Sequence, residues 1–252
     1  MAQVPLDDMT FTLLHDSAIV PDPIAVDTRL MQRASSPVAQ IWGTSRALVM
    51  PRAYSRYPNV DAVRGRLAAR GLPVYVRASG GGLVPQGPGI LNVSLAYPLP
   101  GPVGHWVEPI YRHLCALLSL ALAPFGIDAR PAAVTGSFCD GRFNLAHGRG
   151  TDVRKIAGTA QYWRLNAARD SGYTVLAHAL LLVQPDLAAI HRDLNAFEHA
   201  IHSGRSYDAG KTTSVAQLTA VDSAGDLMQR VRGNLSTAIE RAEPPRITCA
   251  SN

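Results

Sequence analysis

Glycine is concentrated in one short stretch of this sequence, and that stretch restricts how the chain can fold. From Arg77 to Pro98 the residues read RASGGGLVPQGPGILNVSLAYP, with three consecutive glycines and then Gly-Pro-Gly inside an apolar run. Each glycine beyond those that a turn needs costs backbone entropy on folding. A main chain without Cβ atoms, however, lets a ligand lie directly against its amides. The stretch therefore predicts a ligand-binding loop, with a ligand-free glycine-rich hairpin as the alternative.

Strand-like segments flank the glycines on both sides. PVYVRAS (73–79) precedes them and GILNVSLAYP (89–98) follows. Phosphate-binding loops of the GxGxxG and GxxxxGK[ST] types open a helix, because the helix N-terminal amides and dipole hold the phosphate. This stretch matches neither motif and joins two strands, so the sequence argues against a dinucleotide-binding or P-loop fold.

The rest of the chain alternates strand-like and helical patterns. Amphipathic helices are predicted over 22–34, 59–71, 105–127, 185–197 and 214–242, and residues 243–252 as a loose tail. Strands are predicted over 38–43 and 46–51, around a turn at Thr44-Ser45, and over 154–165 and 173–183. No repeat, linker or domain boundary is evident. We therefore expect one α/β domain over residues 1–252.

The composition is that of a globular protein. Of 252 residues, 47% are hydrophobic and 17% charged, which is enough apolar material for a sizeable core. The net charge of +5 comes almost entirely from scattered arginines, since Lys155 and Lys211 are the only lysines. Without a dense basic run, a nucleic-acid partner is not expected, although an acidic partner is compatible with this charge.

The cysteines and the N-terminus bear on the cellular setting. Cys115, Cys139 and Cys249 have no CxxC or Cys/His spacing, so neither a disulfide framework nor a metal site is predicted. Cys115 lies inside an apolar helical run and is interpreted as a small buried residue. The N-terminus lacks a basic region, and nowhere do about 18 apolar residues run together. We expect a cytoplasmic protein without a membrane partner.

Three separated motifs, taken in order, resemble the lipoate/octanoate protein ligase and acyltransferase family, which shares a fold with the catalytic domain of biotin protein ligases. The first motif is matched by Arg77, Ser79, Gly80, Gly81, Gly82, Val84, Gly89, Asn92 and Ser94. The second is matched by Lys155, Gly158, Ala160 and Gln161, and the third by His178, Leu181 and Leu182. The resemblance covers about residues 27 to 215. It implies an α+β type of domain with a largely antiparallel mixed sheet packed by helices.

The chain departs from the family pattern at several positions. Val76 replaces the first arginine of a pair, and Gln86 and Gly87 stand where the family usually keeps His-Asp. In the third motif, Ala177 replaces one histidine of a pair and Ala179 a glycine. These changes predict a pocket shaped for a different head group or a different acyl chain.

The resemblance implies an acyl-binding site around the glycine loop. Backbone amides approach the acyl group there, and burial of the chain contributes about 0.8 kcal/mol per CH₂. Leu83, Val84, Leu91 and Val93 are expected to form the apolar wall, and Arg77 and Ser79 to orient the loop. The full set of expected substrate-binding residues is Arg77, Ser79, Gly80, Gly81, Gly82, Val84, Gln86, Asn92, Gly158, Thr159, Ala160 and His178.

Lys155 and Cys139 are the expected catalytic residues. The family lysine contacts the acyl carbonyl and, in the ligases, the adenylate phosphate, because an ammonium neutralises oxyanion charge. One branch of octanoyltransferases carries a cysteine about fifteen residues before this lysine, in a segment similar to Phe138-Cys139-Asp140. A neighbouring ammonium would favour the nucleophilic thiolate. The alternative is that Cys139 is a small buried residue beside the loop.

The expected function is transfer of an octanoyl or lipoyl group, through a cysteine thioester and without a cofactor, to a lysine of a lipoyl-domain protein. The donor would be an acyl-carrier protein or free lipoate or octanoate. One alternative is an ATP- and Mg-dependent lipoate-protein ligase that forms a lipoyl-adenylate. Another is a non-catalytic acyl-binding protein. About 37 residues follow Val215, so we expect no separate C-terminal accessory domain of the kind that many ligases carry, and this favours the transferase.

Overall fold

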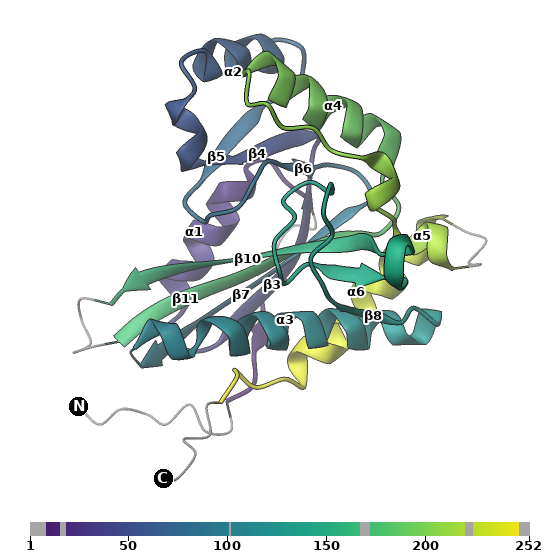
Figure 1. Ribbon diagram of the computed structural model, residues 1–252. Helices are drawn as coiled ribbons and strands as arrows, with labels where there is room; N and C mark the ends of the chain where they lie inside the picture. The colour runs from purple at the N-terminus through teal and green to yellow at the C-terminus, as the bar shows by residue number, and fades with distance from the viewer. Residues whose placement is uncertain (1–8, 16–18, 101, 167–171, 220–223, 247–252) are drawn as a thin grey trace.

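A large mixed sheet forms the centre of the molecule (Figure 1). The computed structural model describes residues 9–15, 19–100, 102–166, 172–219 and 224–246. In spatial order the strands are β1 (Thr12–Leu13), β3 (Val38–Thr44), β7 (Ile90–Pro100), β11 (Gly172–Leu182), β10 (Arg154–Leu165), β9 (Leu145–His147) and β8 (Ala129–Pro131). β2 (Ile19–Val20) pairs with the far end of β3. Among the described strands of this large sheet, only β1 and β2 run parallel to their neighbour, which confirms the largely antiparallel mixed sheet.

A smaller sheet holds the glycine-rich stretch. β4 (Ala47–Pro51) lies between β5 (Val74–Arg77), which runs parallel to it, and β6 (Val84–Gln86), which runs antiparallel. The runs on either side of Thr44-Ser45 are strands as predicted, but they belong to different sheets. Thr-Ser lacks the glycine or asparagine that a tight hairpin requires. The chain therefore crosses from one sheet to the other at this point.

Helices cover both faces of the large sheet. α1 (Pro23–Arg33) packs on one face, and α3 (Val107–Leu122) packs with α6 (Ala224–Glu240) on the other. The apolar stripe predicted on the long central helix is buried, namely Ile110, Leu114, Leu117, Leu118 and Ala121. Among the described residues, no helix has the length and hydropathy needed to cross a bilayer.

The remaining helices surround the smaller sheet and the C-terminal segment. α2 (Val60–Ala68) and α4 (Leu187–Ala200) pack with the smaller sheet, above the large sheet in Figure 1. The helix predicted over 214–242 is instead two helices, α5 (Val215–Leu218) and α6, because Thr219 adopts an extended conformation and ends α5. Cys249 and most of the predicted tail lie outside the described residues.

Strand alternation in β7 decides which predicted wall residues face the site. Asn92 and Ser94 line a pocket above the sheet, whereas Leu91 and Val93 belong to the core beneath α3 and α6. Leu83 is also buried in a core cluster and does not line the pocket. Successive side chains on a strand point to opposite faces. The expectation that Leu83, Leu91 and Val93 wall an acyl chain is therefore wrong, and Val84 alone of the four lines the pocket.

Candidate active site

A pocket lies between the large sheet, the smaller sheet and α1. It contains about 590 Å³ of empty space when the part that opens to solvent is included, and its lining is mostly apolar. Two cross-strand rows of the large sheet form its floor. One row is Ser94, His178 and Ala160, and the other is Asn92, Leu180 and Gly158. Other residues of its lining are Ile24, Asp27, Trp42, Val49, Arg77, Val84, Gln86, Phe138, Cys139 and Thr159.

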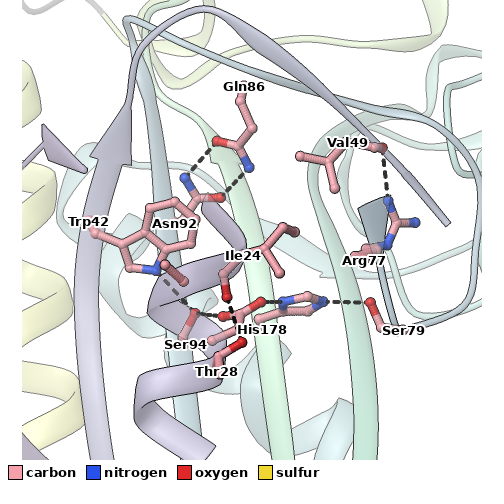
Figure 2. A network of polar contacts seen from close by, with 12 residues as sticks. Ile24, Thr28, Trp42, Val49, Arg77, Ser79, Gln86, Asn92, Ser94 and His178 are labelled. Carbon is pink, nitrogen blue, oxygen red and sulfur yellow. Dashed lines mark hydrogen bonds and ion pairs between the residues drawn. The ribbon is translucent and has the colours of Figure 1, made fainter. Parts of the chain in front are cut away.

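Arg77 holds the glycine loop in place from the end of β5. Its side chain is buried, and burial lowers the pKa of this guanidinium. Nη1 donates to the Val49 carbonyl at 3.0 Å, and Nη2 donates to the carbonyls of Gly80 and Gly82 at 3.0 and 2.6 Å. Val49 and the loop thus contact one side chain, and Figure 2 shows the bond to Val49. Arg77 therefore has the geometry of a loop-orienting residue.

The glycine loop lies directly against Cys139. The Gly82 amide donates to the Cys139 sulfur at 3.2 Å. A Cβ built on Gly81, where φ is +102°, would lie 2.8 Å from that sulfur. A Cβ on Gly82 would lie 3.4 Å from the Cys139 Cα. The glycines therefore allow the loop backbone to approach the thiol and place an N–H donor on it.

Cys139 has an unusual backbone conformation. Its φ is +47°, in the left-handed region that costs a residue with a side chain about 1 kcal/mol or more. The Cys139 carbonyl accepts hydrogen bonds from Gly141 N at 2.9 Å, Asn144 Nδ2 at 3.1 Å and Lys155 Nζ at 3.0 Å. Such strain persists where surrounding contacts over-determine it, and it clusters at functional sites. The half-buried thiol is thus held at a fixed place in the pocket wall.

Lys155 is fully buried beneath this loop. Its ammonium donates to the carbonyls of Phe138 and Cys139 at 2.6 and 3.0 Å and lies 4.3 Å from the centroid of the Phe138 ring. A Cβ on Gly158 would lie 3.1 Å from Nζ, so the missing side chain leaves room for the ammonium. Burial lowers the lysine pKa to about 8, and the charges of Cys139 and Asp140 partly oppose that shift. The expected pair is therefore brought together, but through the backbone carbonyls of the loop.

A chain of polar side chains crosses the pocket floor (Figure 2). Ser79 Oγ lies 3.3 Å from His178 Nε2, and His178 Nδ1 donates to Asp27 at 2.9 Å. Ser94 donates to the other Asp27 oxygen at 2.9 Å and accepts from Trp42 Nε1 at 3.1 Å. The order Ser–His–Asp resembles a hydrolase triad, but Ser79 is only 5% exposed and lines neither cavity among the described residues. These hydrogen bonds fix the orientation of the side chains on the pocket floor.

Gln86 and Asn92 form a second polar feature of the pocket. Each side-chain amide donates to the other, at 2.9 and 2.8 Å, and both residues are buried. The pair connects β6 of the smaller sheet to β7 of the large sheet (Figure 2). Gln86, at the position of the family histidine, is thus satisfied by a protein partner.

A more open, polar cleft lies on the other side of Cys139. Its lining includes the loop glycines 80–82, Tyr111, Asp140, Gln161 and Arg205. Cys139, Thr159 and Ala160 line both the cleft and the pocket. A thiol at this junction can form a covalent bond to a group that lies in the pocket and pass that group to a molecule in the cleft.

The sequence did not identify several residues of this site. Asp27 and Trp42 line the pocket, Arg205 lines the cleft, and Tyr54 accepts a hydrogen bond from Arg205. None of the four has a motif of its own, and tertiary folding alone brings them together. Cys115 is buried against the Phe143 carbonyl, and burial raises its pKa to about 12, in agreement with the interpretation as a structural residue. Within the described part of the chain, no cluster of three or more His, Cys, Asp or Glu side chains could hold a metal ion.

Comparison with known proteins identifies the family. Residues 21–235 match the model of the lipoyl protein ligase A/B catalytic domain. The chain belongs to this family. The match confirms the resemblance found in the three motifs, and the family is one of enzymes.

Individual members of the lipoyl ligase family agree with this assignment. A protein of Cupriavidus necator without a characterised function is 45% identical, over 89% of this chain and 93% of its own length. An octanoyl-[GcvH]:protein N-octanoyltransferase of Kyrpidia tusciae is 34% identical, over 90% of this chain and 78% of its own. The crystal structure of a lipoate-protein ligase A with bound ATP superposes with a TM-score of 0.64 at 18% identity, covering 91% of this chain and 85% of that one. The structural likeness confirms the expected fold.

Proposed function

We propose that this chain transfers an octanoyl or lipoyl group to a lysine of a lipoyl-domain protein through a thioester on Cys139. The observation that carries the proposal is the position of the Cys139 sulfur. It receives the Gly82 N–H and lies where an apolar pocket meets an open cleft. The family of the chain and the name of its relative in Kyrpidia tusciae support this choice.

The first half-reaction loads the enzyme. The Cys139 thiolate attacks the carbonyl carbon of a donor thioester, the new C–S bond forms, and the donor leaves as its thiolate. The Lys155 ammonium holds the Cys139 loop through two carbonyls and places a positive charge beside the reacting groups, where negative charge develops during the attack. An N–H donor such as Gly82 N stabilises the same charge.

The second half-reaction releases the product. The unprotonated amine of the acceptor lysine attacks the carbonyl of acyl-Cys139, the C–N bond forms, and the C–S bond breaks. The proton lost by the amine goes to the Cys139 sulfur, which regenerates the thiol. The acyl tail stays in the pocket during both steps, where burial stabilises each CH₂ by about 0.8 kcal/mol.

Two donors fit this chemistry. One is an acyl-carrier thioester. The other is the octanoylated GcvH protein in the name of the Kyrpidia tusciae relative. With this amide donor, the Cys139 sulfur attacks the amide carbonyl, the C–S bond forms and the C–N bond breaks. The donor lysine leaves as an amine that has taken up the proton of the Cys139 thiol. In both cases the partners are acyl-bearing and lipoyl-domain proteins.

The second candidate is an ATP- and Mg-dependent lipoate-protein ligase, for which the ATP-bound structure of the same fold gives the precedent. In that case Lys155 would contact the adenylate, and Cys139 would be dispensable. In the structure, Lys155 donates two hydrogen bonds to the Cys139 loop. Because these bonds direct the ammonium to that loop, the arrangement favours the transferase. A non-catalytic acyl-binding role remains a third candidate, to be tested by the same experiment.

Intact-mass measurement separates these candidates. The protein is incubated with octanoyl-carrier protein, and in parallel with octanoylated GcvH. We expect a one-to-one acyl adduct that is absent in Cys139→Ala, while Cys115→Ala keeps it. Modification of a lipoyl domain by free octanoate, dependent on ATP and undiminished in Cys139→Ala, would establish the ligase instead. Bound octanoate without any transfer would establish the acyl-binding role.

A further inference from the structure

A second polar cluster lies beside the cleft and has no part in the reaction above. At its centre is Glu198 of α4, which is fully buried. The Tyr54 hydroxyl donates to Glu198 Oε1 at 2.7 Å, and the Tyr207 hydroxyl donates to the same oxygen. Arg205 Nη1 in turn donates to the Tyr54 oxygen at 2.8 Å, and its guanidinium lies 5.4 Å from the Tyr54 ring centroid.

This cluster holds the Arg205 side chain in one orientation. Burial and the Glu198 charge raise the pKa of Tyr54 to about 12 and also raise the pKa of Tyr207. Both phenols therefore stay protonated at neutral pH and donate to the carboxylate. Because the Tyr54 hydroxyl donates to Glu198, its oxygen is a stronger acceptor for Arg205. This hydrogen bond and the contact with the Tyr54 ring fix an otherwise flexible arginine.

Arg205 projects into the cleft close to the nucleophile. A Cβ on Gly82 would lie 3.4 Å from the Cys139 Cα and 3.7 Å from Arg205 Nη1, so little more than the Gly82 backbone separates them. Arg205 is exposed and lines the cleft together with Asp140. A guanidinium has five N–H donors, and within the described residues only Nη1 makes a side-chain hydrogen bond. The remaining donors are available to a ligand in the cleft.

We propose that Arg205 determines acceptor specificity by binding a carboxylate that lies next to the target lysine. The inference rests on the proposed function, in which that lysine must reach acyl-Cys139. Neighbouring Cα atoms are 3.8 Å apart, so a residue adjacent to the lysine lies at the opening of the same cleft, where the exposed Arg205 is within reach of its side chain. Asp140 there is complementary to the lysine ammonium and Arg205 to the carboxylate. A carrier phosphate is a poorer fit, because it lies at the opposite end of a long prosthetic arm from the thioester.

The test separates the two half-reactions. Acyl-Cys139 is first formed with octanoyl-N-acetylcysteamine, a small donor without a charge. Transfer is then timed to three versions of one lipoyl domain, with Asp, Asn or Lys next to the target lysine. We expect the wild type to prefer the Asp acceptor by about tenfold over the Asn acceptor. Arg205→Gln should lose that preference, and Arg205→Glu should prefer the Lys acceptor.

Arg56→Gln is the matched control, because Arg56 also lies over a tyrosine ring, 5.2 Å from the Tyr57 centroid, but does not line the cleft. It should keep the preference for the Asp acceptor. An unchanged preference in Arg205→Gln would overturn the proposal. The proposal would also be overturned if octanoyl-carrier protein loads Arg205→Gln more slowly than the wild type while transfer to the lipoyl domain keeps its normal rate. That result would show that Arg205 binds the phosphate of the donor. Absence of acyl-Cys139 in every protein, wild type included, would instead contradict the proposed function.

Discussion

At the scale of single residues, Gly81 is a position where an added side chain would displace the Cys139 thiol. Its φ of +102° disfavours other residues, and a Cβ would lie 2.8 Å from Cys139 Sγ and 3.2 Å from Arg77 Nη2. Gly81→Ala should lower the rate of acyl-enzyme formation about tenfold or more and cost about 1–3 kcal/mol of stability. Gly65→Ala on α2, where a Cβ meets nothing within 4 Å, should retain the rate. Equal rates in the two variants would contradict the close packing of the loop on the thiol.

Lys155 makes a pH-dependent contribution to stability. Burial lowers its pKa from 10.5 to about 8 in the folded protein. Between these pH values the unfolded chain binds more protons than the folded one, so this contribution to the free energy of unfolding rises with pH. The free energy of unfolding of the wild type minus that of Lys155→Met should therefore rise between about pH 8 and pH 10.5, by at most about 1.4 kcal/mol per pH unit. Urea titrations at several pH values measure it. A flat difference would show that the folded lysine keeps its usual pKa, a falling one that its pKa is raised, and either would contradict the prediction.

At the scale of elements, the Gln86–Asn92 pair connects the two sheets. Both amides are buried and each satisfies the other. Gln86→Leu or Asn92→Leu alone leaves one amide unpaired and should cost about 1–3 kcal/mol. The double variant should cost less than the sum of the two, as measured by urea unfolding in a double-mutant cycle. Additive losses would mean that the pair does not couple β6 to β7.

The strands and helices near the site were largely predictable from local patterns, but their partners were not. Periodicity located the strand on each side of the glycines and the buried stripe of α3. The separation of β3 and β4 into different sheets, and the face of β7 that meets the pocket, depend on contacts between distant segments. The motif spacing placed Cys139 near Lys155, yet it could not show that the ammonium binds carbonyls, because that contact depends on the left-handed turn at Cys139. Arg205 reaches the cleft through the Tyr54–Glu198 contact, for which the sequence carries no local signal.

At the scale of the whole molecule, the pocket runs across the large sheet from the strand of Gly158 to the strand of Trp42. These strands, β10 and β3, are separated by three strand spacings, or about 14 Å. Ile24 lines the pocket from α1. Ile24→Trp should shorten the space and shift loading from octanoyl toward hexanoyl and butanoyl thioesters, measured by competition and intact mass. Ile19→Trp, at a 68% exposed position outside the pocket, should keep the octanoyl preference. Unchanged chain preference in Ile24→Trp would mean that the acyl tail lies elsewhere.

The central claim for the whole molecule is that Cys139 carries the acyl group between two proteins. The direct measurement is a single-turnover chase of isolated octanoyl-enzyme, without ATP, by a lipoyl domain, with both masses followed over time. We predict that the enzyme returns to its unmodified mass at the rate at which the lipoyl domain gains one octanoyl group on a lysine. An octanoyl-enzyme that persists, or that hydrolyses while the lipoyl domain stays unmodified, would contradict the account.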